Sequence, residues 1–123
     1  MHPALSDAMS EIPDLLQRTQ AFAVASSTFY RRLPKTPAAQ APGIRYLRAS
    51  GGVDLHYRAA RRARSRAELL RTLETVVDHA DECVACLELM RNRKVAEDER
   101  LLSEAKRLCA LFTKSLKTAK RNV

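Results

Sequence analysis

The chain has little glycine and few aromatic residues, and this composition points toward helices. Only three of the 123 residues are glycine and 5% are aromatic. Alanine, leucine, arginine and glutamate dominate instead, which favours an all-helical domain. The length suits one domain with one sizeable core and is too short for two.

Long apolar runs are also missing, and cysteines are few. No segment approaches the ~20 apolar residues of a membrane span. The first residues, MHPALSDAMSEIPD, contain no cationic region followed by an apolar run, so we expect no signal peptide. The three cysteines are an odd number, which does not suit a disulfide framework. We therefore expect a reduced, cytoplasmic setting and no membrane partner.

The clearest helical pattern in the sequence is the stretch 65–90. Its apolar side chains recur at alternating spacings of four and three, the pattern of the inward face of a bundled helix. Ser65 and Glu68 form an S-x-x-E capping box at its start. Neither proline nor glycine interrupts the stretch. The predicted inward positions are Leu69, Leu73, Val76, Ala80, Cys83, Leu87 and Met90.

Three more helices are predicted around this one. The first runs from about residue 13 to 33. In the second, Thr36 is the N-cap and Pro37 the first helical residue. The last, 97–121, has acids at its start and bases at its end, which suits the helix dipole. We expect Val76, Leu87, Leu108 and Phe112 to be fully buried in one core.

Short connections between four helices predict an all-α fold, an up-down-up-down antiparallel four-helix bundle. The bundle should cover residues 12–123, and residues 1–11 form a flexible N-terminal lead-in. Within the second helix, Pro42-Gly43 predicts a kink or a delayed start.

The second helix carries apolar residues on two opposed faces. Ile44, Leu47, Gly51 and Leu55 share one face, about half a turn from the other at 100° per residue. One face would serve the bundle and the other a neighbouring subunit. The alternative, a small domain that wraps its own second helix, is about equally favoured. The predicted oligomer interface is the face with Tyr46, Val53, Tyr57 and Ala60.

Positive charge exceeds negative charge, with a net charge of +8, and it is unevenly distributed. Residues 40–66 contain seven arginines and one aspartate. Such a balance indicates an acidic partner, an anionic membrane surface or nucleic acid. On the last helix, the cations on the side away from the core are Lys106, Arg107, Lys114, Lys117, Lys120 and Arg121. The cations that crowd the end of the second helix are Arg58, Arg61, Arg62, Arg64 and Arg66.

Three segments carry a family resemblance: RRLPKTPAAQ (31–40), HYRAARRARSRAELL (56–70) and ADECVACLELM (80–90). Over nearly its whole length, the chain resembles the four-helix-bundle proteins of the 23S rRNA intervening-sequence family. That family also contains the accessory protein of diversity-generating retroelements. The resemblance implies a homopentamer, a basic surface, nucleic-acid binding and no catalytic activity. The chain departs from the family at His56, Ala59 and Pro42, where members similar to it carry Asn, Glu and a regular helix.

The chain offers little catalytic or metal-binding chemistry. Cys83 and Cys86 lie near His79 on one helix, but a zinc site of this type normally uses turns and a second pair. Buried packing of these thiols is the favoured interpretation. We find no nucleophile-base arrangement and no glycine-rich phosphate loop. We therefore predict no enzyme activity, no metal and no cofactor.

Two classes of function remain. The first is a nucleic-acid-binding module, for DNA or RNA, that contacts phosphates without reading sequence. The second is a protein-interaction scaffold, an accessory subunit for a nucleic-acid enzyme such as a reverse transcriptase. The alternative to both is a solvated basic surface that has no specific ligand.

Overall fold

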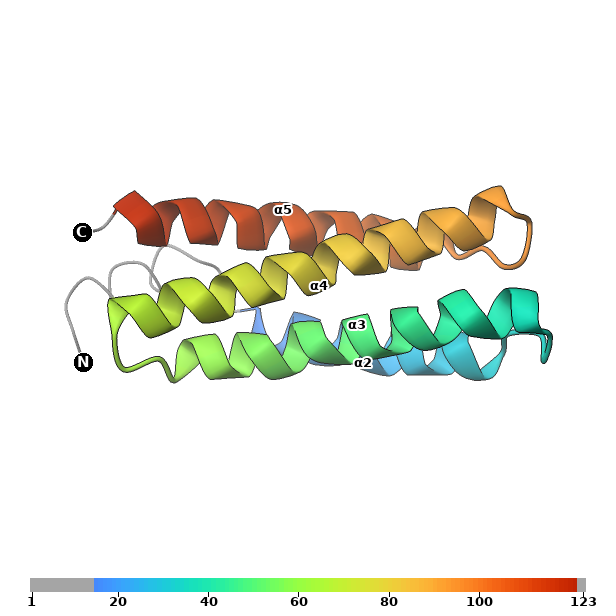
Figure 1. Ribbon diagram of the computed structural model, residues 1–123, viewed down its shortest axis with the longest axis horizontal. Coiled ribbons are helices and arrows are strands. Elements are labelled where there is room, and N and C mark those ends of the chain that lie inside the picture. The colour runs from blue at the N-terminus through green and yellow to red at the C-terminus, as the bar shows by residue number, and fades with distance from the viewer. Residues whose placement is uncertain (1–14, 122–123) are drawn as a thin grey trace.

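The computed structural model describes residues 15–121, and these form four helices joined by short connections. Successive helices run in opposite directions, as Figure 1 shows, and no strand occurs among these residues. The predicted antiparallel four-helix bundle is confirmed, whereas the predicted lead-in, 1–11, lies outside the described residues. The helices are α2 (Leu16–Arg31), α3 (Pro37–Arg61), α4 (Arg66–Asn92) and α5 (Glu99–Arg121).

Side chains cap three of the helices. Thr36 accepts a hydrogen bond from the amide three residues on at 3.3 Å, Ser65 does the same at 3.1 Å, and Asp98 at 3.0 Å. The predicted caps Thr36 and Ser65 are thus confirmed. The capping box at Ser65 differs in one respect, because the Glu68 carboxylate accepts from the amide of Arg64 rather than of Ser65, at 3.3 Å.

Pro42 does not delay or divide α3, so the predicted delayed start is wrong. The helix runs without a break from Pro37 to Arg61. The cap at Thr36 has already begun the helix, so Pro42 removes one backbone hydrogen bond from the second turn. Its ring is buried in the bundle, and this apolar burial offsets part of the loss.

The core is the one that the apolar spacing predicts. All seven inward positions of α4 are buried. Val76 and Phe112 are 0% exposed, Leu108 1% and Leu87 3%, which confirms their predicted burial. None of the four described helices is long and apolar enough to span a membrane.

The predicted oligomer interface on α3 is wrong, because its residues lie inside the protomer. Tyr46 is 0% exposed, and Val53, Tyr57 and Ala60 are 1% exposed each. The two tyrosine hydroxyls are bonded within the bundle, Tyr46 to Ser26 and Tyr57 to the amide of Leu15. Long side chains with one polar end therefore fill the space between α3 and its neighbours.

The opposite face of α3 is the one that solvent reaches. Leu55 is 66% exposed and Ile44 37%. A Cβ added at Gly51 would meet nothing within 4 Å, so this part of the helix surface is open. Gly52, by contrast, faces α4, where the ring of His79 would lie 2.8 Å from an added Cβ.

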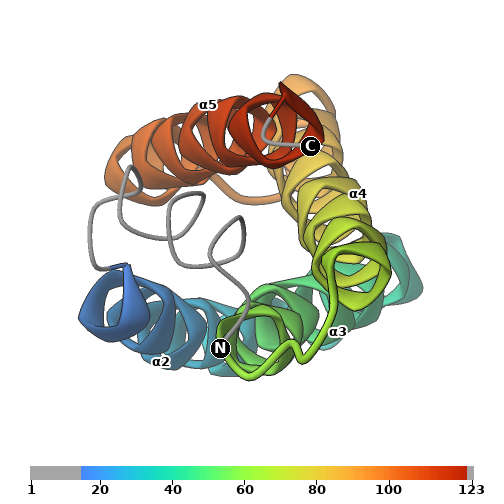
Figure 2. The same cartoon turned by 90° about the vertical axis from the view of Figure 1, so that its left-hand side faces the viewer.

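Seen from one end, the helices follow one another around the bundle (Figure 2). α3 packs on both α2 and α4, and α4 also packs on α5, while α2 and α5 touch more sparsely. An ion pair joins these last two helices, between the Arg18 guanidinium and the Glu104 carboxylate at 2.7 Å. The hydrogen bond to Glu104 raises the pKa of Arg18 further, so this guanidinium stays charged at every ordinary pH.

Candidate nucleic-acid interface

The two basic segments of the sequence meet at one end of the bundle. The turn between α3 and α4 lies at the same end as the last turn of α5 (Figure 1). There the guanidinium of Arg66 donates to the backbone carbonyl oxygen of Lys120 at 2.8 Å. We call this region the basic end, and it comprises Arg62, Arg64, Arg66, Lys117, Lys120 and Arg121.

The five predicted arginines near this end differ in their exposure and in whether other groups of the protomer contact their guanidinium groups. Arg62 and Arg64 are exposed, and no ion pair engages their guanidinium groups within residues 15–121. Arg58 forms an ion pair with Asp54 at 3.4 Å, and Arg61 lies 6.0 Å above the ring of Tyr57. Arg66 has a structural role, because its guanidinium bonds to the backbone of α5 and its Nε is buried. The first two are therefore the ones best placed for an external anion.

All six predicted cations of α5 are exposed. Two of them face carboxylates of α4, Lys106 with Glu88 at 3.6 Å and Lys120 with Glu74 at 3.9 Å. Exposed pairs of this kind contribute at most about 1 kcal/mol to stability. They nevertheless place negative charge where a phosphate would have to approach, so the six cations are not equivalent.

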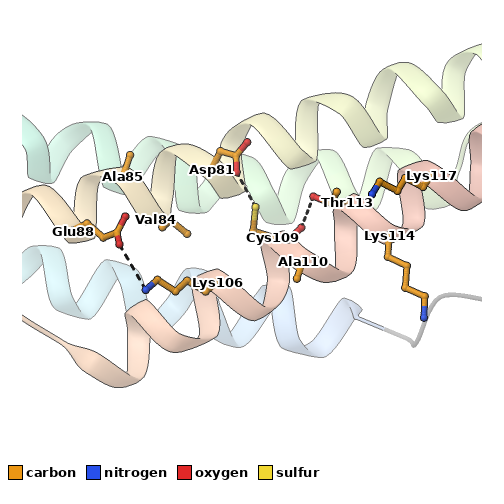
Figure 3. Close-up of a pocket in the computed structure, with 10 residues that line it drawn as sticks. All are labelled: Asp81, Val84, Ala85, Glu88, Lys106, Cys109, Ala110, Thr113, Lys114 and Lys117. Carbon is orange, nitrogen blue, oxygen red and sulfur yellow. Dashed lines mark hydrogen bonds and ion pairs between the residues drawn. The ribbon is translucent and has the colours of Figure 1, made fainter.

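A groove runs between α4 and α5 beside these pairs (Figure 3). Its apolar floor includes Val84, Ala85 and Ala110. The thiol of Cys109 donates to the carboxylate of Asp81 at 2.8 Å. Burial, together with this carboxylate, raises the pKa of Cys109 to about 11, so the thiol is protonated at neutral pH. A protonated thiol is a poor nucleophile and a poor metal ligand.

The other two thiols also suit a role in core packing better than a catalytic or metal-binding role. Cys83 is 0% exposed and Cys86 4%, which confirms their predicted place in the core. Burial raises the pKa of both. Within residues 15–121, no three His, Cys, Asp or Glu side chains lie close enough together to hold a metal ion.

One contact between α3 and α4 is not predicted from the sequence. The rings of His56 and His79 stack with their centroids 5.0 Å apart and their planes 11° from parallel. Burial and the neighbouring His79 lower the pKa of His56, which favours the neutral ring. The pair joins α3 to α4, at a position where the family resemblance implies a different side chain. Only the relative register of the two helices reveals this contact.

No protein-family model matches this chain, and no curated protein matches its sequence significantly. Its fold is similar to that of a solved protein of unknown function from the S23 ribosomal protein family of Bacteroides thetaiotaomicron. The two structures superpose with a TM-score of 0.76 and are 21% identical, and the match covers 84% of this chain and 95% of the other. At this identity, the likeness shows a shared fold.

Proposed function

We propose that this protein is a non-enzymatic, basic four-helix-bundle oligomer that binds nucleic acid through its phosphates, without sequence specificity. The observation that carries the proposal is the basic end. Two segments more than fifty residues apart in the chain bring their cations together there, through the contact of Arg66 with Lys120. Arg62, Arg64 and Arg121 are exposed at this end and form no ion pair within residues 15–121.

Phosphates suit this surface better than bases do. Recognition of unpaired bases relies on aromatic side chains on which the bases stack. The rings of Tyr46, Tyr57 and Phe112 are buried in the core, and Arg61 covers the edge of the core at Tyr57. Cations without such platforms bind the backbone by releasing its condensed counterions. Affinity should therefore fall steeply with salt and vary little with sequence.

Assembly into a homo-oligomer is part of the proposal. The exposed apolar residues Leu55 and Ile44 on the outer face of α3 support it. The family resemblance favours a pentamer. In a closed ring, each protomer would present its own basic end, so weak contacts would add through multivalency. The same apolar face also supports the second candidate function, a scaffold that holds a protein such as a reverse transcriptase.

The test is a salt series of fluorescence anisotropy with unrelated DNA and RNA duplexes. Replacing Arg62 and Arg64 by Gln should flatten the slope of log affinity against log salt by about 1.8, since each lost phosphate contact removes about 0.9. The loss should be similar for all sequences. A matched control replaces Arg31 and Arg32, which are exposed at the opposite end of the bundle, and should change the slope little.

Three results would contradict the proposal: no binding at low salt, binding that is indifferent to salt, or equal loss in the variant and its control. The scaffold function makes a different prediction. It expects little binding to free nucleic acid and clear binding to an acidic or polymerase-like protein.

A further inference from the structure

The cations of α5 lie in two rows that face different neighbours. Lys106 and Lys117 of the α4-side row border the groove against α4 (Figure 3). The α2-side row recurs every seven residues, a spacing that drifts by only about 20° around the helix per step. The α4-side row comprises Lys106, Lys117 and Lys120, and the α2-side row comprises Arg100, Arg107, Lys114 and Arg121.

Contacts place the start of the second row near α2. Arg100 lines a hollow together with Ala21 and Ala25 of α2. Glu104, between Arg100 and Arg107 on α5, is bonded to α2 as well. Lys114 touches the edge of the α4–α5 groove, but its amine points away from α4 in Figure 3. The two rows converge toward the end of α5, where Lys114 and Arg121 line one hollow with Lys117 and Lys120. Arg100 is not among the cations predicted from the sequence, although its spacing from Arg107 is the same as that of the other members.

Acids of α4 pair with two of the three cations of the α4-side row. Glu74, Asp81 and Glu88 are themselves seven residues apart, so they form an acidic row along the face of α4 that meets α5. Because the helices are antiparallel, the first of these reaches Lys120 and the last reaches Lys106. A phosphate approaching this row would meet three carboxylates well within the ~8–10 Å over which charges act at ordinary salt.

The α2-side row meets fewer acids, although Asp98 and Glu104 line the same hollow as Arg100. The sequence of α2 contains no Asp or Glu. The acid of α5 nearest to this side, Glu104, is engaged by Arg18 at 2.7 Å. All four cations of the row are exposed, and none forms an ion pair within residues 15–121. Most of the cations of α5 that have no ion pair within residues 15–121 therefore belong to this row.

We propose that the α2-side row extends the phosphate-contacting surface of the basic end along α5 and that its ligand is a nucleic-acid duplex lying along this row. This inference rests on the proposed function. From Arg100 to Arg121 the row spans about 32 Å at ~1.5 Å per residue, close to the ~34 Å of one DNA turn. It continues directly into the basic end, which Arg121 shares.

Two triple variants with the same change of charge test the assignment. The salt slope on a 20-base-pair duplex should flatten by about 2.7 when three cations of the α2-side row become Gln, and by less than about 0.9 for the α4-side row. Circular dichroism should show that both variants are folded. The first variant is Arg107→Gln, Lys114→Gln and Arg121→Gln, and the second is Lys106→Gln, Lys117→Gln and Lys120→Gln.

A gain of binding provides an independent measurement. Replacing Glu74 and Glu88 by Gln frees Lys120 and Lys106 from their carboxylates. The double variant should bind the duplex more tightly than wild type and steepen the salt slope by up to about 1.8. Unchanged binding would overturn the claim that these acids prevent the α4-side row from binding phosphates.

The outcomes separate this inference from the proposed function. A wild type that binds no duplex at low salt defeats both. A wild type that binds, with equal loss in the two triple variants or a larger loss in the second, leaves phosphate binding intact and overturns the row assignment. Equal or tighter binding of the separated strands overturns the choice of a duplex.

Discussion

Two adjacent glycines in α3 have opposite surroundings, although the sequence treats them alike. An added Cβ at Gly52 would lie 2.8 Å from the ring of His79, closer than real side chains approach one another. At Gly51, nothing lies within 4 Å. The close approach of α3 and α4 therefore requires glycine at one position. Nothing within the described part of the protomer requires it at the other.

Alanine substitutions should separate the two roles. Gly51→Ala should raise the free energy of unfolding by about 0.5–1 kcal/mol, because glycine costs this much in a helix interior. Gly52→Ala should lower it by about 1–3 kcal/mol, because the His79 ring must shift in a packed core. Urea unfolding at equal protein concentration measures both. Similar effects at the two positions would contradict this packing.

At the scale of the element, α5 depends on a few large side chains. Phe112 is 0% exposed, and its ring centroid lies 5.3 Å from that of Tyr57 on α3. Phe112→Ala should lower the free energy of unfolding by about 3–5 kcal/mol, the usual cost of a large core aromatic. Val24→Ala, at a side chain that is 67% exposed, is the control and should change it by less than about 0.5 kcal/mol. A loss below about 1 kcal/mol for Phe112→Ala would mean that α5 packs otherwise.

The sequence predicts the helices well because their patterns are local. Spacing identifies the inward face of α4, and Thr36 and Ser65 mark two helix starts. The inward face of α3 is not local information, since both of its faces are apolar. Partners on other elements decide it: Ser26 and the amide of Leu15 bond the two tyrosine hydroxyls.

The candidate site, like the fold, can be predicted from the sequence only where the information is local. Sequence places the cations on α5 and at the end of α3, where all but Arg58 and Arg66 prove to be exposed. It does not separate the two rows of α5, because that requires the register of Glu74 and Glu88 against the helix. It also does not show that two distant basic segments share one end of the bundle.

At the scale of the whole molecule, the outer face of α3 is the candidate surface for self-assembly. If the protein is an oligomer through this face, Leu55→Glu should shift it toward the protomer, because a charge would be buried at the contact. Light scattering or sedimentation measures the change. Tyr57→Glu is not a suitable test, since Tyr57 is buried in the protomer and its replacement should unfold the chain.

The matched control is Val24→Glu on α2. Val24 is 67% exposed, almost the same as Leu55, and lies on a different helix. This variant should assemble as the wild type does. A monomeric wild type, or assembly unchanged by Leu55→Glu, would rule out an interface at this face.

The His79 ring opposite Gly52 also limits how the bundle can move. A slide of α4 along α3 by one turn, about 5.4 Å, would carry the ring from Gly52 toward Arg48 or His56, where a side chain occupies the space. We therefore expect α3 and α4 to behave as one rigid body with a fixed register. Motion should be confined to the sparsely packed boundary between α2 and α5. A duplex bound along that boundary would then act as a clamp across the most sparsely packed pair of neighbouring helices within residues 15–121.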